Sequence, residues 1–307
     1  MDNYNILWLV FTATAAILFI LDIKLSSSKA HEISAKESLM LCSFWIFIAA
    51  IYGFLAGHLL TQEKMFEFFT AYVIEYSLSV DNMFVFLMIF SYFNIPKKYQ
   101  PKILTWGILG AVFMRLIMIF AGVALIERFH WVIYVFGLVL VYTAFKMYFQ
   151  SEEKIEPEKN PILKLLSKFL PFDTKTETSD FFLRKGKLYA TTMFATLIVI
   201  ESTDLVFAVD SIPAVLAIST DKLIVYTSNV FAVVGLRSLY FLLAYISDYF
   251  RYLKKGVSIV LLYVGIKMLI SGVYKISPIS SLVVVLGILA GSILLSLLIP
   301  HNKEKPA

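Results

Sequence analysis

The sequence predicts an all-α polytopic membrane protein with about nine transmembrane helices, which contain two inverted three-helix repeats. Of its 307 residues, 59% are hydrophobic and 16% are charged, and the mean hydropathy is +0.80. Soluble domains are only about 45 to 50% apolar. Nine apolar segments approach the roughly 20 residues that cross a bilayer. The order of the charges inside these segments repeats between the two halves of the chain.

The nine segments have a helical period, and none alternates like a strand of a membrane barrel. They span residues 5–23, 39–60, 66–93, 102–126, 131–149, 188–218, 222–246, 256–275 and 279–299. The first segment has neither a preceding basic residue nor a following small-residue cleavage pattern, so we expect a retained helix rather than a signal peptide. The single cysteine, Cys42, excludes an intramolecular disulfide and a thiolate metal cluster.

Lysine and arginine set the expected orientation, because cytoplasmic loops carry the excess of these residues. The loops after segments 2, 4, 6 and 8 hold one each, namely Lys64, Arg128, Lys222 and Lys275. The other loops hold many more. We therefore expect the N-terminus outside and the C-terminus in the cytoplasm. The net charge of +5 needs no nucleic-acid partner, since the basic residues lie where topology places them.

A polar stretch at residues 150–187 divides the membrane part in two and is expected to be a cytoplasmic linker. Within it, "PILKLLSKFL" has one apolar side, which fits a helix on the membrane surface or a short connecting helix. The predicted organisation is an N-terminal two-helix segment (1–65), a first repeat (66–149), the linker (150–187), a second repeat (188–275) and a C-terminal helix with a short tail (276–307).

The repeat is seen in the positions of the intramembrane charges. An offset of 129 residues relates Glu75 to Asp204 and Asp81 to Asp210, and one of 122 relates Arg115 to Arg237. Because each half has three segments, an odd number, corresponding segments cross the membrane in opposite directions. Such inverted repeats place the substrate site of many transporters near the bilayer midplane.

Five carboxylates inside the predicted spans need compensation, since a charge at mid-membrane costs at least about 2.5 kcal/mol. They are Glu75, Asp81, Glu201, Asp204 and Asp210. Arg115 and Arg237 can pair with two of them. Ser79, Asn82, Ser211 and Asn229 are expected as supporting polar groups. Three explanations are open: acids and arginines that only hold helices together, a proton relay, or a site for a hard divalent cation, which oxygen ligands suit.

Helix geometry complicates a single site. At 100° per residue, Glu75 and Asp81 point about 120° apart, as do Asp204 and Asp210. Pro213 deprives the Val209 carbonyl of its helical donor, so a broken helix could turn Asp210 inward, although a simple packing kink explains the proline equally well.

With these motifs in place, the chain resembles the TerC family of integral membrane proteins, named for tellurium resistance. The resemblance rests on "EYSLSVDNMFVFLMIFSYF" and "ESTDLVFAVDSIPAVLAIS", with "RLIMIFAG", "FFLRKGKLYAT" and "TSNVFAVVGLRSLYFLLA" in support. It implies a bacterial inner-membrane protein, similar to the branch associated with manganese export. The family's acidic motifs fall on Glu75, Asp81, Asn82, Glu201, Asp204, Asp210 and Ser211.

The sequence therefore predicts a secondary transporter, not an enzyme, that exports a divalent cation around Asp81 and Asp210. The ion is expected to be Mn²⁺ because of the resemblance, since oxygen ligands alone do not separate Mn²⁺ from Mg²⁺ or Ca²⁺. No permanently bound cofactor is expected, and the lipid bilayer is the other expected partner. The alternative is a non-transporting accessory protein for tellurite resistance, or for metal loading and quality control of exported proteins.

Overall fold

The computed structural model describes residues 2–27, 34–149, 161–168, 170–173, 178–185, 187–246 and 252–298, without the side chains of 18, 21–27, 81, 185 and 246. Its long helices are α1 (Asn3–Ser27), α2 (Ala35–Leu59), α3 (Gln62–Tyr92), α4 (Gln100–Arg128), α5 (Val132–Phe149), α7 (Thr192–Leu216), α8 (Lys222–Val234), α9 (Leu236–Ile246), α10 (Leu253–Ile270) and α11 (Pro278–Leu298). The short elements are η1 (Lys97–Tyr99), α6 (Pro161–Leu166), β1 (Phe172–Asp173), β2 (Phe182–Lys185) and β3 (Lys187–Thr191).

Each predicted membrane segment overlaps a long helix. Six helices in the described part of the chain are long and apolar enough to cross a membrane, and a seventh span is possible if α8 and α9, bent by 44° relative to each other, act as one. Helix α10 has only 18 residues and includes Lys254, Lys255 and Lys267. The fold thus gives six or seven candidate spans rather than nine.

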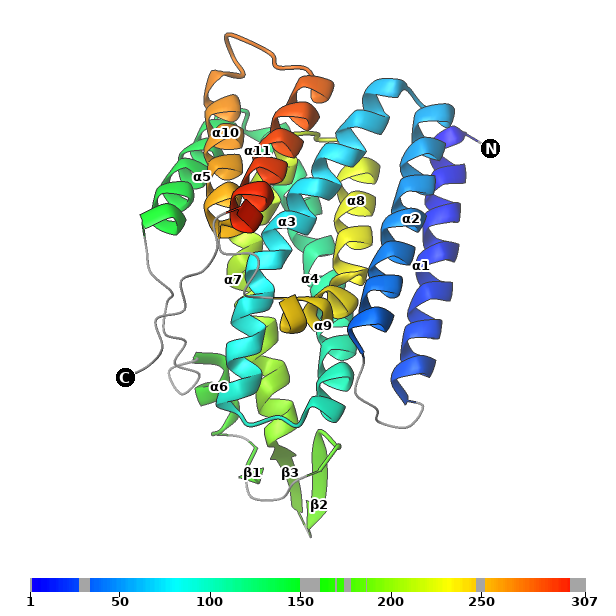
Figure 1. Cartoon of the computed structure of the whole chain (residues 1–307), viewed down its shortest axis with the longest axis vertical. Coiled ribbons are helices and arrows are strands. Elements are labelled where there is room, and N and C mark those ends of the chain that lie inside the picture. Colours follow the sequence, from blue (N-terminus) through cyan, green and yellow to red (C-terminus); the bar gives the residue numbers. More distant parts are fainter. Residues whose placement is uncertain are drawn as a thin grey trace.

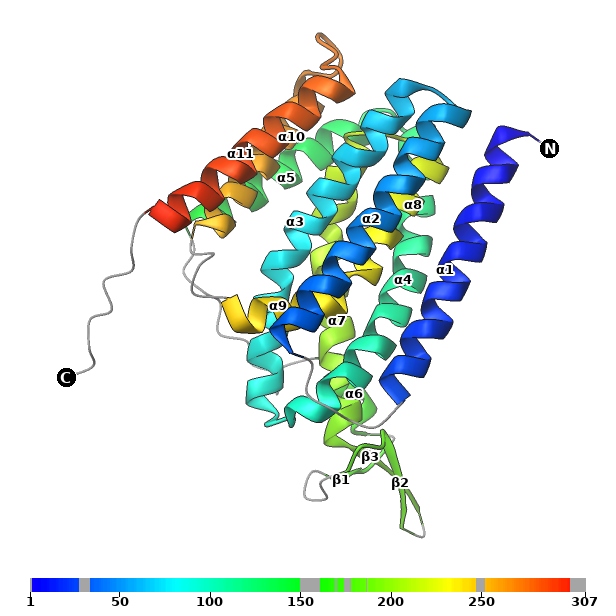
Figure 2. The ribbon, with the colours of Figure 1, turned by 45° about the vertical axis from the view of Figure 1, so that its right-hand side comes forward.

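Figure 1 shows how the helices are arranged. The connections α2–α3 and α10–α11 lie at one end of the molecule with the N-terminal end of α1, and the small sheet lies at the other end. Figure 2 shows α5, α10 and α11 as a tilted layer on one side of α3, while α1 lies on the opposite side of the bundle.

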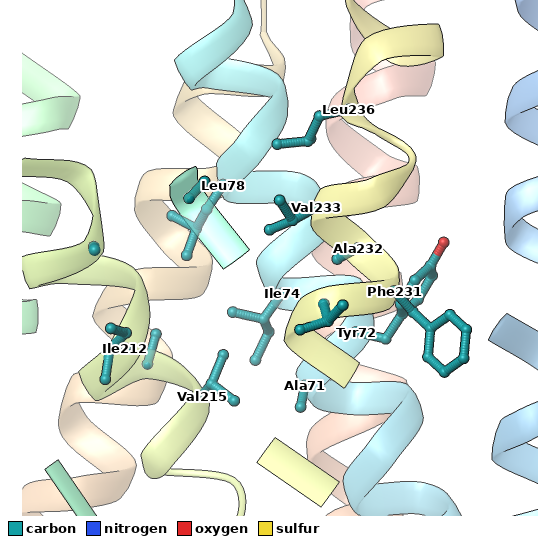
Figure 3. Packing of buried hydrophobic residues seen from close by; sticks show 14 of the residues in the cluster. Ala71, Tyr72, Ile74, Leu78, Ile212, Val215, Phe231, Ala232, Val233 and Leu236 are labelled. Carbon is teal, nitrogen blue, oxygen red and sulfur yellow. The ribbon is translucent and has the colours of Figure 1, made fainter. Parts of the chain in front are cut away.

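Buried apolar side chains hold the centre together. Figure 3 shows Ile74 of α3 near Val215 of α7 and Val233 of α8, and all three are fully buried. Glycines permit close packing in the outer layer: a Cβ on Gly137 of α5 would lie 3.1 Å from the Gly265 carbonyl oxygen, and one on Gly265 of α10 would lie 3.0 Å from that of Gly137. Small residues of this kind let membrane helices approach closely.

A three-stranded sheet of order β1-β3-β2 corrects the all-α prediction, with β1 and β2 in the predicted linker and β3 running from the last residue of the linker into the start of the predicted second repeat. Strand β1 pairs parallel with β3, and β2 pairs antiparallel with β3. The helical period expected from residue 188 onwards is therefore wrong at its start. Helix α7 begins at Thr192, where the Thr191 hydroxyl accepts from the Phe194 amide as an N-cap.

The bend in the second half of the chain lies elsewhere than the sequence suggested. Helix α7 continues through Pro213, and the Ala217 amide donates to the Pro213 carbonyl, so the break that would have turned Asp210 inward is not there. The bend lies instead in the next span, between α8 and α9 at Gly235.

Candidate functional site

The polar core lies where α3, α4, α7 and α8 meet. Each helix contributes one side chain: Glu75, Arg115, Asp204 and Asn229, which we call the Arg115 cluster. None of the four is more than 4% exposed. Since α3 and α4 come from the first half of the chain and α7 and α8 from the second, the cluster joins the two halves.

Arg115 is the centre of this cluster. Its Nη1 donates to Glu75 Oε1 and, at 3.2 Å, to Asn229 Oδ1. Its Nη2 donates to Asp204 Oδ1 at 3.2 Å. Arg115 thus pairs with two intramembrane carboxylates, Glu75 and Asp204. The cluster therefore holds one negative charge more than positive charge.

Several buried polar atoms around Arg115 make no hydrogen bond within the described residues. They are Glu75 Oε2, Arg115 Nε and Asn229 Nδ2 in the cluster, and the hydroxyl oxygens of Ser79 and Ser211 beside it. Each buried polar atom without a partner lowers the free energy of unfolding by about 1 to 3 kcal/mol. Unsatisfied polar groups are uncommon in native cores, so their concentration here indicates a site that can take up a further ligand.

A small cavity opens next to the cluster. It has a volume of about 20 Å³ and its surface is almost entirely apolar, with Glu201 and Asp204 as the two acidic residues among those that line it. A cavity of roughly 10 to 15 Å³ or more holds one water molecule. Glu201 Oε2 is buried and makes no hydrogen bond among the described atoms. The cavity thus has room for one water or one small ion beside two carboxylates.

Glycines of α4 make room for Glu201. A Cβ on Gly110 would overlap the Glu201 carboxylate, with its Cδ at only 2.5 Å, and a Cβ on Gly107 would touch Glu201 Oε1 at 3.9 Å. The carboxylate therefore rests against bare backbone of α4. Any side chain at position 110 would displace it from the cavity.

Asp210 lies apart from these groups. Its Oδ1 accepts a hydrogen bond from the Thr143 hydroxyl of α5 at 2.8 Å. Because α7 is a continuous helix, Asp204 and Asp210 point in different directions, about 120° apart at 3.6 residues per turn. The structure thus places Asp210 on the side of α7 that faces α5.

The remaining predicted residues have mixed outcomes. Arg237 is 6% exposed and its Nη1 donates to the Thr105 hydroxyl at 3.2 Å. Asn82 is buried at 7% exposure. Asp81 belongs to α3 by its backbone, but its side chain lies outside what the structure describes.

The four predicted acids whose side chains are described, Glu75, Glu201, Asp204 and Asp210, do not lie together as one group. Among the described side chains, no three of the His, Cys, Asp and Glu residues lie close enough to hold a metal ion together. The groups that do come together are Glu201 and Asp204 at the cavity, with Glu75 behind them across Arg115.

Sequence reasoning missed three contributors to the site. Thr143 and Thr105 lie on helices adjacent to the acids and arginines they bind, and isolated threonines in apolar helices give no pattern that would identify them. Gly110 had a detectable signal, because Gly107, Gly110 and Ala111 fall at helical spacing on one side of α4.

The fold and this site define a multi-pass helical membrane protein with a buried network of ionisable groups, the feature that marks functional sites inside membranes. The family model of the integral membrane protein TerC family matches residues 60–304. The chain belongs to this family.

Similar proteins cover nearly the whole chain. The "Uncharacterized membrane protein STKORF319" of Myxococcus xanthus is 43% identical over 293 residues, which is 95% of this chain and 92% of that protein. The "Putative membrane-bound redox modulator Alx" of Salmonella typhi is 41% identical over 310 residues, covering 98% and 96%, and its namesake of Escherichia coli (strain K12) is 39% identical, covering 98% and 97%. No solved structure matches the chain significantly.

Proposed function

We propose that the protein is a secondary transporter that exports a divalent cation, Mn²⁺ above all, from the cytoplasm of a bacterial cell across the inner membrane. The cation is the transported substrate and not a resident cofactor. It would bind at the cavity where Glu201 and Asp204 are the acidic residues, and Glu75, which lies behind them across Arg115 and too far away to complete a three-carboxylate ligand set in this structure, would add negative charge. The sequence predicted a site around Asp81 and Asp210. We now place it at Glu201 and Asp204, because Asp210 is turned toward Thr143.

The observation that carries this proposal is the charge of the described core. Glu75, Glu201 and Asp204 bring three carboxylates, and Arg115 brings one positive charge. If all are ionised, the balance is two negative charges, which one divalent cation neutralises. Arginine and carboxylates that served only to hold helices together would be expected to match each other in charge and in hydrogen bonds, as buried ion pairs need to be.

Arg115 also suggests how the site works without a bound ion. A guanidinium that bridges Glu75 and Asp204 keeps these two acids paired while the site is empty. When a cation binds the carboxylates, it takes over part of this role, and Arg115 can shift toward Glu75 and Asn229, which it also contacts. Exchange of partners of this kind couples the presence of the ion to the packing between the halves.

Helix contacts support alternating access by two inverted repeats. Helix α3 packs on α8, and α4 packs on α7. If α3 corresponds to α7 and α4 to α8, these are the same contact with the halves exchanged, as a two-fold axis in the membrane plane requires. Helix α5 also packs on α10, a contact that an axis exchanging these two helices maps onto itself.

The names of the relatives raise a redox role as a second possibility. The chain has one cysteine, Cys42, and its side chain is 4% exposed in α2. A dithiol–disulfide couple needs two thiols in reach of each other, so we do not favour thiol chemistry for this chain. The accessory role in tellurite resistance or metal loading makes no use of a buried site with excess negative charge.

A transport assay separates these functions. Cellular Mn²⁺, Mg²⁺ and Ca²⁺ are measured in cells with and without the protein, and Mn²⁺ flux is measured in vesicles that contain the purified protein. We expect Glu201→Gln to abolish flux while the protein stays folded. Glu127→Gln is the matched control, because Glu127 is exposed and pairs with Lys222 at 3.5 Å. Unchanged metal contents together with changed tellurite tolerance would favour the accessory role.

Topology is tested by thiol labelling in a Cys42→Ser background. Single cysteines at positions 160 and 254 should react from the cytoplasmic side, and those at 62 and 221 from outside. Labelling of positions 62 and 160 from the same side would contradict the inverted repeats and the orientation with the N-terminus outside.

A further inference from the structure

A second ionic network lies at the end of the molecule opposite the sheet, about two helical turns from the Arg115 cluster along α3 and α8. Three helix starts meet there: α1 at Asn3, α3 at Gln62 and α8 at Lys222 (Figure 1). If the predicted orientation holds, this is the outer end. The network consists of Tyr4, Lys64, Glu67, Ser219 and Asp221, and we call it the outer latch.

Lys64 is the centre of the outer latch. Its ammonium lies 2.8 Å from Glu67 Oε2 and 3.4 Å from Asp221 Oδ2. The Ser219 hydroxyl donates to Glu67 Oε2 at 2.5 Å, and the Tyr4 hydroxyl donates to Asp221 Oδ2 at 2.9 Å. Side-chain exposure is 26% for Lys64, 10% for Glu67 and 12% for Asp221. These three side chains are thus mostly shielded from water, and Lys64 is the most exposed of them.

The latch joins parts of the chain that must separate during transport. Lys64 and Glu67 stand on α3 in the first half of the chain, while Ser219 and Asp221 belong to the turn between α7 and α8 in the second half. Asp221 also caps α8, because its Oδ1 accepts from the Leu223 amide at 3.1 Å. A displacement of the Asp221 side chain would therefore also affect the start of α8. Movement of one half against the other would break the latch first.

The opposite end of the bundle is closed differently. There the Gln100 side chain donates to the Ile95 carbonyl at 3.1 Å and accepts from the Tyr240 hydroxyl at 3.0 Å. These two contacts are neutral, and an ion pair at this end, Lys102 with Asp180 at 3.5 Å, is more exposed than the ion pairs of the latch, with side chains 37% and 65% exposed. Lys64 is the most exposed of the three charged side chains of the latch, at 26%, so its ammonium can exchange a carboxylate partner for water when the contact opens.

We propose that the outer latch is the gate that closes the exit path of the substrate, and that its opening exposes the cavity at Glu201 and Asp204 to the outside. This inference rests on the proposed transport function and adds the contact that controls one side of it. Lys267 of α10 donates to the Ser281 hydroxyl at 2.9 Å. Lys64 remains the cation that bridges the two halves.

The test measures access to the cavity and not transport. Ala111 lines the cavity and is 5% exposed, so an Ala111→Cys reporter is introduced in a Cys42→Ser background and labelled from outside with a membrane-impermeant maleimide. Lys64→Gln removes the bridging ammonium and leaves two carboxylates facing each other. We expect its labelling rate to rise about fivefold, the shift that follows from losing about 1 kcal/mol of partly exposed ion pairs.

Lys222→Gln is the matched control, because Lys222 lies at the same end but pairs with Glu127 outside the latch. Lys64→Arg should keep the rate near that of the parent. Equal rates in the Gln variants at positions 64 and 222, or a reporter that stays unlabelled in all of them, would overturn the latch. The labelling rate does not depend on which ion is transported. If the parent protein carries no Mn²⁺ but Lys64→Gln still labels faster than Lys222→Gln, the proposed substrate is refuted and the gate is not.

Discussion

Arg115→Gln would take one guanidinium away from three buried acceptors at once. Glu75 and Asp204 would then face each other across the core without a cation, and Asn229 would lose its donor. Breaking one buried ion pair costs about 3 to 5 kcal/mol. We expect the free energy of unfolding to fall by at least this much, because two carboxylates are left unpaired rather than one.

Changes on the acid side should be milder. In Glu75→Gln or Asp204→Asn, Arg115 keeps its second carboxylate and its bond to Asn229. The loss is that of one hydrogen bond to a charged group, about 1.5 to 3 kcal/mol, and it is offset by the removal of one buried negative charge. A triple variant of Glu75→Gln, Arg115→Gln and Asp204→Asn removes every charge of the cluster, and we expect it to recover most of the stability.

Equilibrium unfolding in mixed micelles, followed by circular dichroism, measures these differences. Arg128→Gln is the matched control, since Arg128 is an exposed arginine at the end of the same helix. The reasoning is refuted if Arg115→Gln is as stable as Arg128→Gln, or if the triple variant is less stable than Arg115→Gln alone. The second result would show that shape, and not charge pairing, holds the cluster together.

Two further predictions concern the neighbours of the acids. Gly110→Ala should displace the Glu201 carboxylate and reduce Mn²⁺ flux in vesicles about tenfold or more, whereas Gly287→Ala, where a Cβ meets nothing within 4 Å, should leave it unchanged; equal fluxes would contradict the role of the glycine. Thr143→Val should leave Asp210 without its donor and lower the free energy of unfolding by about 1 to 3 kcal/mol, whereas Asp210→Asn keeps an acceptor oxygen for Thr143 and should be nearly as stable as the parent.

The sequence was sufficient to predict the helices and the need for Arg115. Apolar segments of about 20 residues identify candidate spans, and a long helix lies at each predicted one. A buried carboxylate in an apolar span requires a cation or a proton, which is why the pairing of Arg115 with acids could be predicted without a structure. Both arguments rest on the cost of polar groups in hydrocarbon.

Which acids would share Arg115 could not be derived in this way. Helical periodicity fixes the angle between Asp204 and Asp210 but not the rotation of α7 against its neighbours. That rotation depends on packing, such as the contact between Gly110 and Glu201. The position of the bend was also missed: Pro213 is accommodated within α7, and the break occurs at Gly235, where the sequence carries no proline.

In the proposed transporter, the sharing of one arginine between two carboxylates would favour divalent over monovalent ions. With Glu75, Glu201 and Asp204 ionised and Arg115 charged, a bound divalent cation makes the described core neutral, while a monovalent cation leaves one negative charge. Moving the site between the two sides of a membrane is easiest when no net charge is buried. The loaded core meets this condition only for a divalent ion, and the empty core meets it only if two protons or other positive charges replace that ion. Neutrality in both states therefore requires that positive charges are exchanged at the carboxylates. In the part of the chain that the structure describes, Arg115 bonds to Glu75, Asp204 and Asn229 but not to Glu201. Glu201 is therefore the carboxylate at which we expect this exchange to begin.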